Sequence, residues 1–205
     1  MGNWISPAAV MDMLYDVRAD GCDDVGYALL RPRSKGCSRT AMDLVSAKLA
    51  PVKPSAKQVS TSEIATTARD FRLILAPKVA DPLSLKQLLE SYDAATQPRQ
   101  ALLAAVLTIK FDPDVPLHDS FDRVCTFAML RLAQVRRLTS IAVLHTPGDE
   151  LAKAAAHAHV CILARRHLAS GWAELDADLS DTAHTLWADE WRTFSHSWER
   201  VLAPP

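Results

Sequence analysis

Two apolar, β-branched runs at residues 139–145 and 157–164 constrain the fold of this chain more than any other feature of its sequence. Each run has the length and the composition of a buried β-strand. The tetrapeptide Thr-Pro-Gly-Asp at 146–149 follows the first run and is typical of a turn. We therefore expect the two runs to pair antiparallel across the connection at 146–156.

Helical patterns elsewhere predict the layers that cover such a sheet. Apolar residues, among them Val135, recur on one face of 118–137, and three tryptophans and a phenylalanine are spaced by three or four positions in 181–201. Further helices are expected at 38–49 and 82–95. Residues 6–15 are expected to open another helix, with Ser6 as its cap and Gly21 as its end. Further strands are expected at 25–30 and 70–77. Alanines and leucines favour a helix at 101–110, although its Val-Leu-Thr-Ile-Lys end would suit a strand. The sequence predicts an α+β fold, a central antiparallel sheet flanked by helices, with a helical C-terminal segment at about 181–202.

Composition narrows the classes of function. The 205 residues fit one domain, and 23 basic against 24 acidic side chains argue against a protein that coats duplex DNA, while leaving room for a local basic groove. The four cysteines form no C-x-x-C pair, so we expect reduced core thiols rather than a zinc ribbon or a disulfide scaffold. No segment has the pattern of a signal peptide or the length of a bilayer span, which predicts a cytoplasmic protein without a membrane partner.

Three histidines fall on the two predicted strands. His157 and His159 are separated by one residue, so the two-residue period of a strand puts both rings on one face. Antiparallel pairing would bring His145 level with them. Three neutral imidazoles would leave coordination positions open for water or a phosphate oxygen, which suits a Lewis-acid site for Mg²⁺, Mn²⁺ or Zn²⁺. The alternative is a pair of surface or hydrogen-bonded histidines without a metal.

This order of features resembles the metal motif of the HUH endonucleases, in particular the relaxases that nick plasmid DNA for mobilisation and conjugation. The motif is a strand that ends in histidine, here I-A-V-L-H at 141–145, then a polar loop, then an H-x-H strand, here H-A-H-V-C-I-L at 157–163. The string F-R-L-I-L-A-P at 71–77 is similar to the central strand of the family. The resemblance implies a relaxase-like domain over residues 1–205 with its core at about 70–166.

The resemblance also implies roles for individual residues. Relaxases attack the scissile phosphate with a tyrosine near the N-terminus while a metal polarises the phosphate oxygens. The resemblance implies that Tyr15 is the nucleophile, which would form a 5′-phosphotyrosine link. Tyr27 and Tyr92 are less suited, being expected in a strand and on a helix.

Basic and acidic residues near the histidines are secondary candidates. Arg165 and Arg166 directly follow the second histidine strand and are predicted to contact DNA phosphates. Asp149 and Glu150, in the connection, could orient an imidazole.

Three hypotheses follow for the function. The first is a relaxase-like protein that binds single-stranded DNA and nicks it by metal-assisted tyrosine transesterification. The second keeps the fold without the enzyme, as an inactive relative that binds DNA or a relaxosome protein. The third is a helical interaction protein in which the histidines are incidental and the aromatic C-terminal helix docks a partner.

Overall fold

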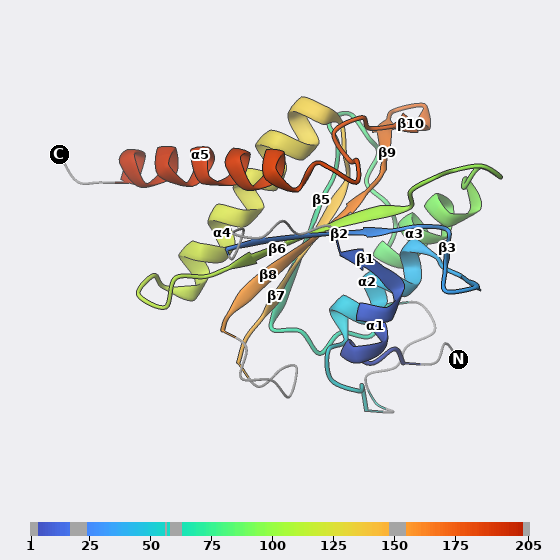
Figure 1. The fold of residues 1–205 in the computed structure, drawn as a ribbon, viewed down its shortest axis with the longest axis horizontal. Helices are drawn as coiled ribbons and strands as arrows, with labels where there is room; N and C mark the ends of the chain where they lie inside the picture. The colour runs from blue at the N-terminus through green and yellow to red at the C-terminus, as the bar shows by residue number, and fades with distance from the viewer. Residues whose placement is uncertain (1–3, 17–23, 56, 58–62, 148–154, 203–205) are drawn as a thin grey trace.

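A six-stranded sheet, with every neighbouring pair antiparallel, forms the centre of the molecule (Figure 1). The computed structural model describes residues 4–16, 24–55, 57, 63–147 and 155–202. The strand order is β1-β2-β6-β8-β7-β5. The α+β class with a central antiparallel sheet, expected from the sequence, is confirmed.

Helices and strands alternate irregularly along the chain. In order they are α1 (Pro7–Met13), β1 (Leu14–Asp16), β2 (Val25–Leu30), β3 (Arg33–Ser34), β4 (Cys37–Ser38), α2 (Ala41–Leu49), β5 (Asp70–Ile74), α3 (Leu85–Ala94), β6 (Ala104–Lys110), α4 (Leu117–Phe127), the π-helix η1 (Ala128–Val135), β7 (Ser140–His145), β8 (His157–Leu163), β9 (Arg165–Leu168), β10 (Gly171–Leu175) and α5 (His184–Leu202). The pairs β3–β4 and β9–β10 form two small hairpins outside the large sheet.

The two faces of the sheet carry different helices (Figure 1). Helices α1, α2 and α3 pack on one face, which we call the α2 face, and α4, η1 and α5 pack on the other, which we call the α5 face. Side chains alternate between the faces along each strand. On β8, Cys161 and Leu163 belong to the core of the α2 face, whereas Val160 and Ile162 belong to that of the α5 face. The position of a residue along its strand therefore determines which face it serves.

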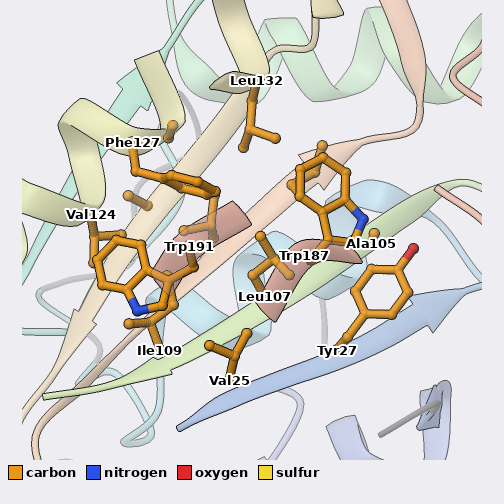
Figure 2. Close-up of a cluster of buried hydrophobic side chains, with 14 of the residues drawn as sticks. Val25, Tyr27, Ala105, Leu107, Ile109, Val124, Phe127, Leu132, Trp187 and Trp191 are labelled. Atoms are coloured by element: carbon orange, nitrogen blue, oxygen red, sulfur yellow. The ribbon is translucent and has the colours of Figure 1, made fainter. Parts of the chain in front are cut away.

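Aromatic residues fill the core of the α5 face. Figure 2 shows Trp187, Trp191 and Phe127 gathered over the strands from which Tyr27 and Leu107 project. Phe127 and Trp191 meet edge to face with ring centroids 5.4 Å apart, an arrangement that suits the charge distribution of aromatic rings. Because both tryptophans are buried, the helical spacing seen in the sequence reflects core packing.

Local signals set the starts of the helices as the sequence indicates. Ser6 caps α1 by accepting a hydrogen bond from the amide of Ala9 at 3.3 Å. The side chains of Thr40 and Ser84 cap α2 and α3 in the same way. Among the described residues, no helix combines the length and the apolar character that a bilayer crossing requires.

The segment at 101–110 corrects the sequence prediction. The helix favoured by its alanines is absent, and residues Ala104–Lys110 form β6, which pairs with β2 on one side and β8 on the other. Strand pairing on both edges overrides the intrinsic helix preference of alanine. Small residues such as Ala104 and Ala105, both fully buried, also let helices approach the two faces of the sheet closely.

The first helix and the strand β5 at the edge of the sheet also differ from the sequence prediction. Helix α1 ends at Met13, and Leu14–Asp16 pairs with β2 as strand β1; the predicted helix end at Gly21 lies outside the described residues. Strand β5 lies at the edge of the sheet and pairs only with β7 among the described strands, so it is not the central strand that the resemblance implied.

The long helix predicted at 118–137 is present as two segments of different winding. Helix α4 is followed directly by the π-helix η1. The wider turn of a π-helix shifts the side chains that follow it around the helix axis. Leu132 consequently remains buried, while Val135, expected on the same face, is 65% exposed.

The described cysteines differ in burial. Cys125 and Cys161 are buried as expected, but Cys37 is exposed. Cys22 lies outside the described residues.

We expect Trp187→Ala to lower the free energy of unfolding by about 3 to 5 kcal/mol. Trp187 is fully buried, donates its indole hydrogen to the Asp178 carbonyl at 2.9 Å, and lies 4.7 Å beneath the Arg136 guanidinium. Urea denaturation measures the loss. The control is Leu186→Ala, one residue earlier on α5 and 43% exposed, which should cost less than about 1 kcal/mol. Equal losses in the two variants would contradict this account of the core.

Candidate metal centre

Register brings the three histidines to one place on the α2 face. His145, the last residue of β7, is directly opposite His157, the first residue of β8. His159 follows on the same face of β8 and is opposite Val143. The ring centroids are 4.7 Å apart for His157 and His159, 4.8 Å for His145 and His159, and 5.3 Å for His145 and His157. The convergence that the spacing predicts is therefore present.

Each ring uses one nitrogen for a hydrogen bond to the surrounding protein. His145 donates from Nε2 to the Lys48 carbonyl at 2.7 Å, and His157 donates from Nδ1 to the Ala155 carbonyl at 2.9 Å. Nδ1 of His159 lies 2.9 Å from the Thr108 hydroxyl. A carbonyl accepts only from a protonated nitrogen, so these bonds fix the tautomers of His145 and His157. In the neutral rings Nδ1 of His145 and Nε2 of His157 are therefore unprotonated and each carries a lone pair.

Nitrogen atoms of the three rings lie close to one another. One ligand atom from each of the three residues lies within 4.8 Å of the others. Nε2 of His157 and Nε2 of His159 are 3.2 Å apart, close to the roughly 3.3 Å expected for two imidazoles at tetrahedral positions on one zinc ion. The second-nitrogen bonds are of the kind that orient metal-bound histidines. The three residues are a group that could hold a divalent cation.

The surroundings determine what such a cation could do. All three rings are buried, at 1% for His145, 8% for His157 and 5% for His159. Three imidazoles leave at least one position of a four-coordinate ion open, as in catalytic rather than structural zinc sites. An all-imidazole set favours zinc or a softer transition metal over Mg²⁺. A bound ion would attract an anionic oxygen strongly, because burial weakens solvent screening.

Cys161 does not join the cluster although it lies two residues after His159 on the same face. Burial raises the pKa of the Cys161 thiol to about 12, and a thiol is a poor ligand compared with a thiolate. Within the described part of the chain, the group that could hold a metal consists of His145, His157 and His159. Asp149 and Glu150, considered as orienting residues, lie outside the described residues.

Two residues of this site escape prediction from the sequence. Lys48 of α2 is buried at 8% exposure, and its Nζ lies 3.1 Å from Nε2 of His159. Thr108 lies on β6, directly opposite His159. Predicting Thr108 required recognition of β6 as a strand, and Lys48 carries no signal in the sequence because its position depends on how α2 docks on the sheet.

A small cavity opens beside the histidines between α1 and α2. Its volume is about 310 Å³, and Pro7, Ala8, Val10, Met11, Ala47, Lys48 and His159 line it. The walls are apolar except for the amine and the imidazole. The cavity therefore offers a ligand a route to the His159 side of the cluster.

Tyr15 is not brought to the histidines. It is half-exposed on β1 and is paired with Leu29, a core residue of the α5 face, so its side chain projects from the face opposite the cluster. Three strand spacings of about 4.8 Å each separate β1 from β8. Its ring lies 4.7 Å from the Arg31 guanidinium. Tyr15 and the histidines therefore lie on opposite faces of the sheet, and the role of Tyr15 as nucleophile stays a prediction.

The two arginines predicted to contact DNA have other partners. Arg165 is buried, and its guanidinium donates to the carbonyls of Ala173, Ala95 and Trp172 at 2.5, 2.5 and 2.6 Å. These three bonds give Arg165 a structural role in the β9–β10 region, and its contact with DNA phosphates stays a prediction. Arg166 is more exposed and pairs with Glu174 across the β9–β10 hairpin at 2.5 Å. Both follow the end of β8 that is remote from His157.

Comparison with known proteins identifies a shared fold. No family model matches the sequence, and no curated protein matches it. A solved structure described as "Molecular Basis of Vancomycin Resistance Transfer in Staphylococcus aureus" superposes with a TM-score of 0.58. The similarity covers 78% of this chain and 84% of the other at 12% sequence identity. At this identity the likeness establishes the fold alone.

His167 is a buried histidine separate from the cluster. Its ring stacks on Trp172 with centroids 3.7 Å apart, and its Nδ1 lies 2.9 Å from the Thr139 hydroxyl. Burial lowers the pKa of His167 from 6.5 to about 4. The unfolded chain therefore binds a proton at this residue over a pH range in which the folded chain does not. The resulting stability is fully present above pH 6.5 and is lost as the pH falls towards 4.

We expect His167→Gln to weaken the acid dependence of folding. Between pH 6.5 and 4 the wild type should lose more stability than the variant, by at most about 3 kcal/mol. Urea unfolding at a series of pH values measures the difference. Parallel stability curves for the two proteins would mean that His167 is not held neutral by the fold.

Proposed function

We propose that this chain is a relaxase-like protein that binds single-stranded DNA beside a divalent cation held by His145, His157 and His159. The observation that carries the proposal is the pattern of ring nitrogens: one nitrogen of each ring is hydrogen-bonded to its surroundings, and the cluster offers one ligand atom per residue within 4.8 Å. A hydrogen bond from the second ring nitrogen is typical of the histidines of metal sites.

A bound metal would supply Lewis-acid polarisation of a phosphate oxygen. The residues of the chain would do the rest. His145 and His157 would be held in the correct tautomer by the Lys48 and Ala155 carbonyls, and Thr108 would orient His159. The apolar residues of α1 that line the neighbouring cavity would exclude water from the anion.

The shared fold supports the choice of nucleic acid as the ligand. The solved structure of similar fold concerns the transfer of vancomycin resistance, and the relaxases that the histidine motif resembles act on plasmid DNA during mobilisation and conjugation. We propose on these grounds that residues 1–205 act as one domain in DNA transfer, with relaxosome proteins as further partners. The location would be cytoplasmic.

A second candidate function is DNA binding without strand cleavage. The positions of all three tyrosines favour it. Tyr15 projects from the α5 face. Burial raises the pKa of Tyr27, and it raises the pKa of Tyr92 to about 12. The Tyr92 hydroxyl is also engaged with the Leu103 carbonyl and the Ala164 amide, so neither buried tyrosine is suited to attack a phosphate.

Replacing a ligand tests the metal site. His159→Ala should reduce the affinity for Mn²⁺ or Zn²⁺ by at least about a hundredfold in isothermal titration calorimetry, because the cluster loses one of three donors. The matched control is His118→Ala on α4, whose side chain is 79% exposed, and it should bind metal like the wild type. Equal metal binding by wild type and H159A would remove the basis of the proposal.

Strand cleavage is tested with Tyr15→Phe. If the chain is a relaxase of the tyrosine type, the wild type should nick supercoiled plasmid in the presence of Mn²⁺ and Y15F should lose at least about a hundredfold in rate. Retention of metal-dependent nicking by Y15F would exclude this residue as the nucleophile. Metal-dependent binding of an oligonucleotide without nicking by the wild type would establish the second candidate instead.

A further inference from the structure

Lys48 contacts two of the three histidines through different atoms. Its carbonyl accepts a hydrogen bond from Nε2 of His145 at 2.7 Å, and its Nζ lies 3.1 Å from Nε2 of His159. A lysine with only 8% of its surface exposed is uncommon in proteins unless its charge is compensated. The side chain therefore reaches the metal-facing side of the cluster rather than solvent.

The two facing nitrogens need a proton or a cation close to them. His157 carries its proton on Nδ1, where it donates to Ala155, so its Nε2 presents a lone pair to Nε2 of His159 only 3.2 Å away. Two lone pairs at this distance repel each other unless a cation or a shared proton lies close. The amine of Lys48 is the cationic group that the described part of the chain brings to Nε2 of His159.

A metal ion and this amine cannot use His159 together. A metal would bind Nε2 of His159 at about 2.1 Å, on the lone pair towards which the amine points at 3.1 Å. The lysine side chain has four flexible carbons. The cavity of about 310 Å³ between α1 and α2 is lined by Lys48 and His159 alike, so it provides space into which the displaced amine can move.

We infer that Lys48 and a divalent cation are alternative occupants of the histidine cluster, and that the amine displaced by the metal binds a phosphate group of single-stranded DNA in the cavity between α1 and α2. This inference rests on the proposed function and adds a means of regulating metal binding to it. Without metal, Lys48 stabilises the cluster and lowers its affinity for ions. With metal, the ammonium and the ion form two positive charges that an anionic oxygen can bridge.

The first experiment measures metal affinity without DNA. Lys48→Met keeps the length and the apolar stem of the side chain, and we expect it to bind Mn²⁺ or Zn²⁺ at least about tenfold more tightly than the wild type in calorimetry. The control is Lys53→Met, an exposed lysine that lies outside the cavity, with wild-type affinity. Metal binding by K48M that is unchanged or weaker than that of the wild type overturns the inference. If the wild type itself binds no metal, the proposed function is overturned instead.

A measurement on the wild type avoids dependence on the folding of K48M. Amine labelling with an N-hydroxysuccinimide ester, followed by mass spectrometry, reports the accessibility of each lysine. Lys48 should be protected without metal and become several-fold more reactive at saturating Zn²⁺, while the reactivity of Lys53 stays constant. Protection of Lys48 that persists when metal is bound would show that the amine is not displaced, and the inference would fail.

The second part of the inference concerns the anion. At saturating Mn²⁺, K48M should bind a single-stranded oligodeoxynucleotide about tenfold or more weakly than the wild type, because one of the two positive charges is missing. K53M again serves as the control. Equal oligonucleotide affinity of K48M and the wild type would exclude Lys48 as the phosphate-binding group.

Discussion

The antiparallel pairing of β7 with β8 is the interaction on which the histidine cluster depends. The ladder sets His145 opposite His157 and leaves His159 one step further along the same face. A slip of one residue would turn His157 and His159 to the α5 face, among Trp187 and Trp191. The register is protected against such a slip because every residue of both strands is buried. A one-residue shift would move large side chains into spaces shaped for small ones.

The two faces of the sheet divide the tasks of the protein. The α5 face holds the large aromatic core, whose burial contributes stability. The α2 face also has an apolar core, but at the ends of β7 and β8 that core gives way to imidazoles, a threonine hydroxyl and a lysine amine. Burying these polar groups is unfavourable unless they bind one another or a ligand. Their concentration at one end of one face is what distinguishes this region from ordinary packing.

Local signals in the sequence were sufficient for part of the fold. Caps and periodicity located α2, α3, α4 and α5, and β-branched runs located β2, β7 and β8, so the convergence of the histidines could be predicted from the two-residue period alone. Strand β6 could not, because its alanines favour a helix and only pairing with β2 and β8 makes it a strand. The features of the site that the sequence does not indicate have the same origin. Thr108, Lys48, Arg165 and the orientation of Tyr15 all depend on contacts between segments distant in sequence, which no local pattern encodes.

The bond from His145 to the Lys48 carbonyl joins the cluster to a helix rather than to the sheet alone. That carbonyl belongs to the last turn of α2, so the geometry of the first histidine is complete only when this helix is seated on the strands. Any cation that prefers the complete arrangement also favours the seated helix, by thermodynamic linkage. Saturation with such an ion should slow hydrogen exchange of the α2 amides, even though none of them touches the ion.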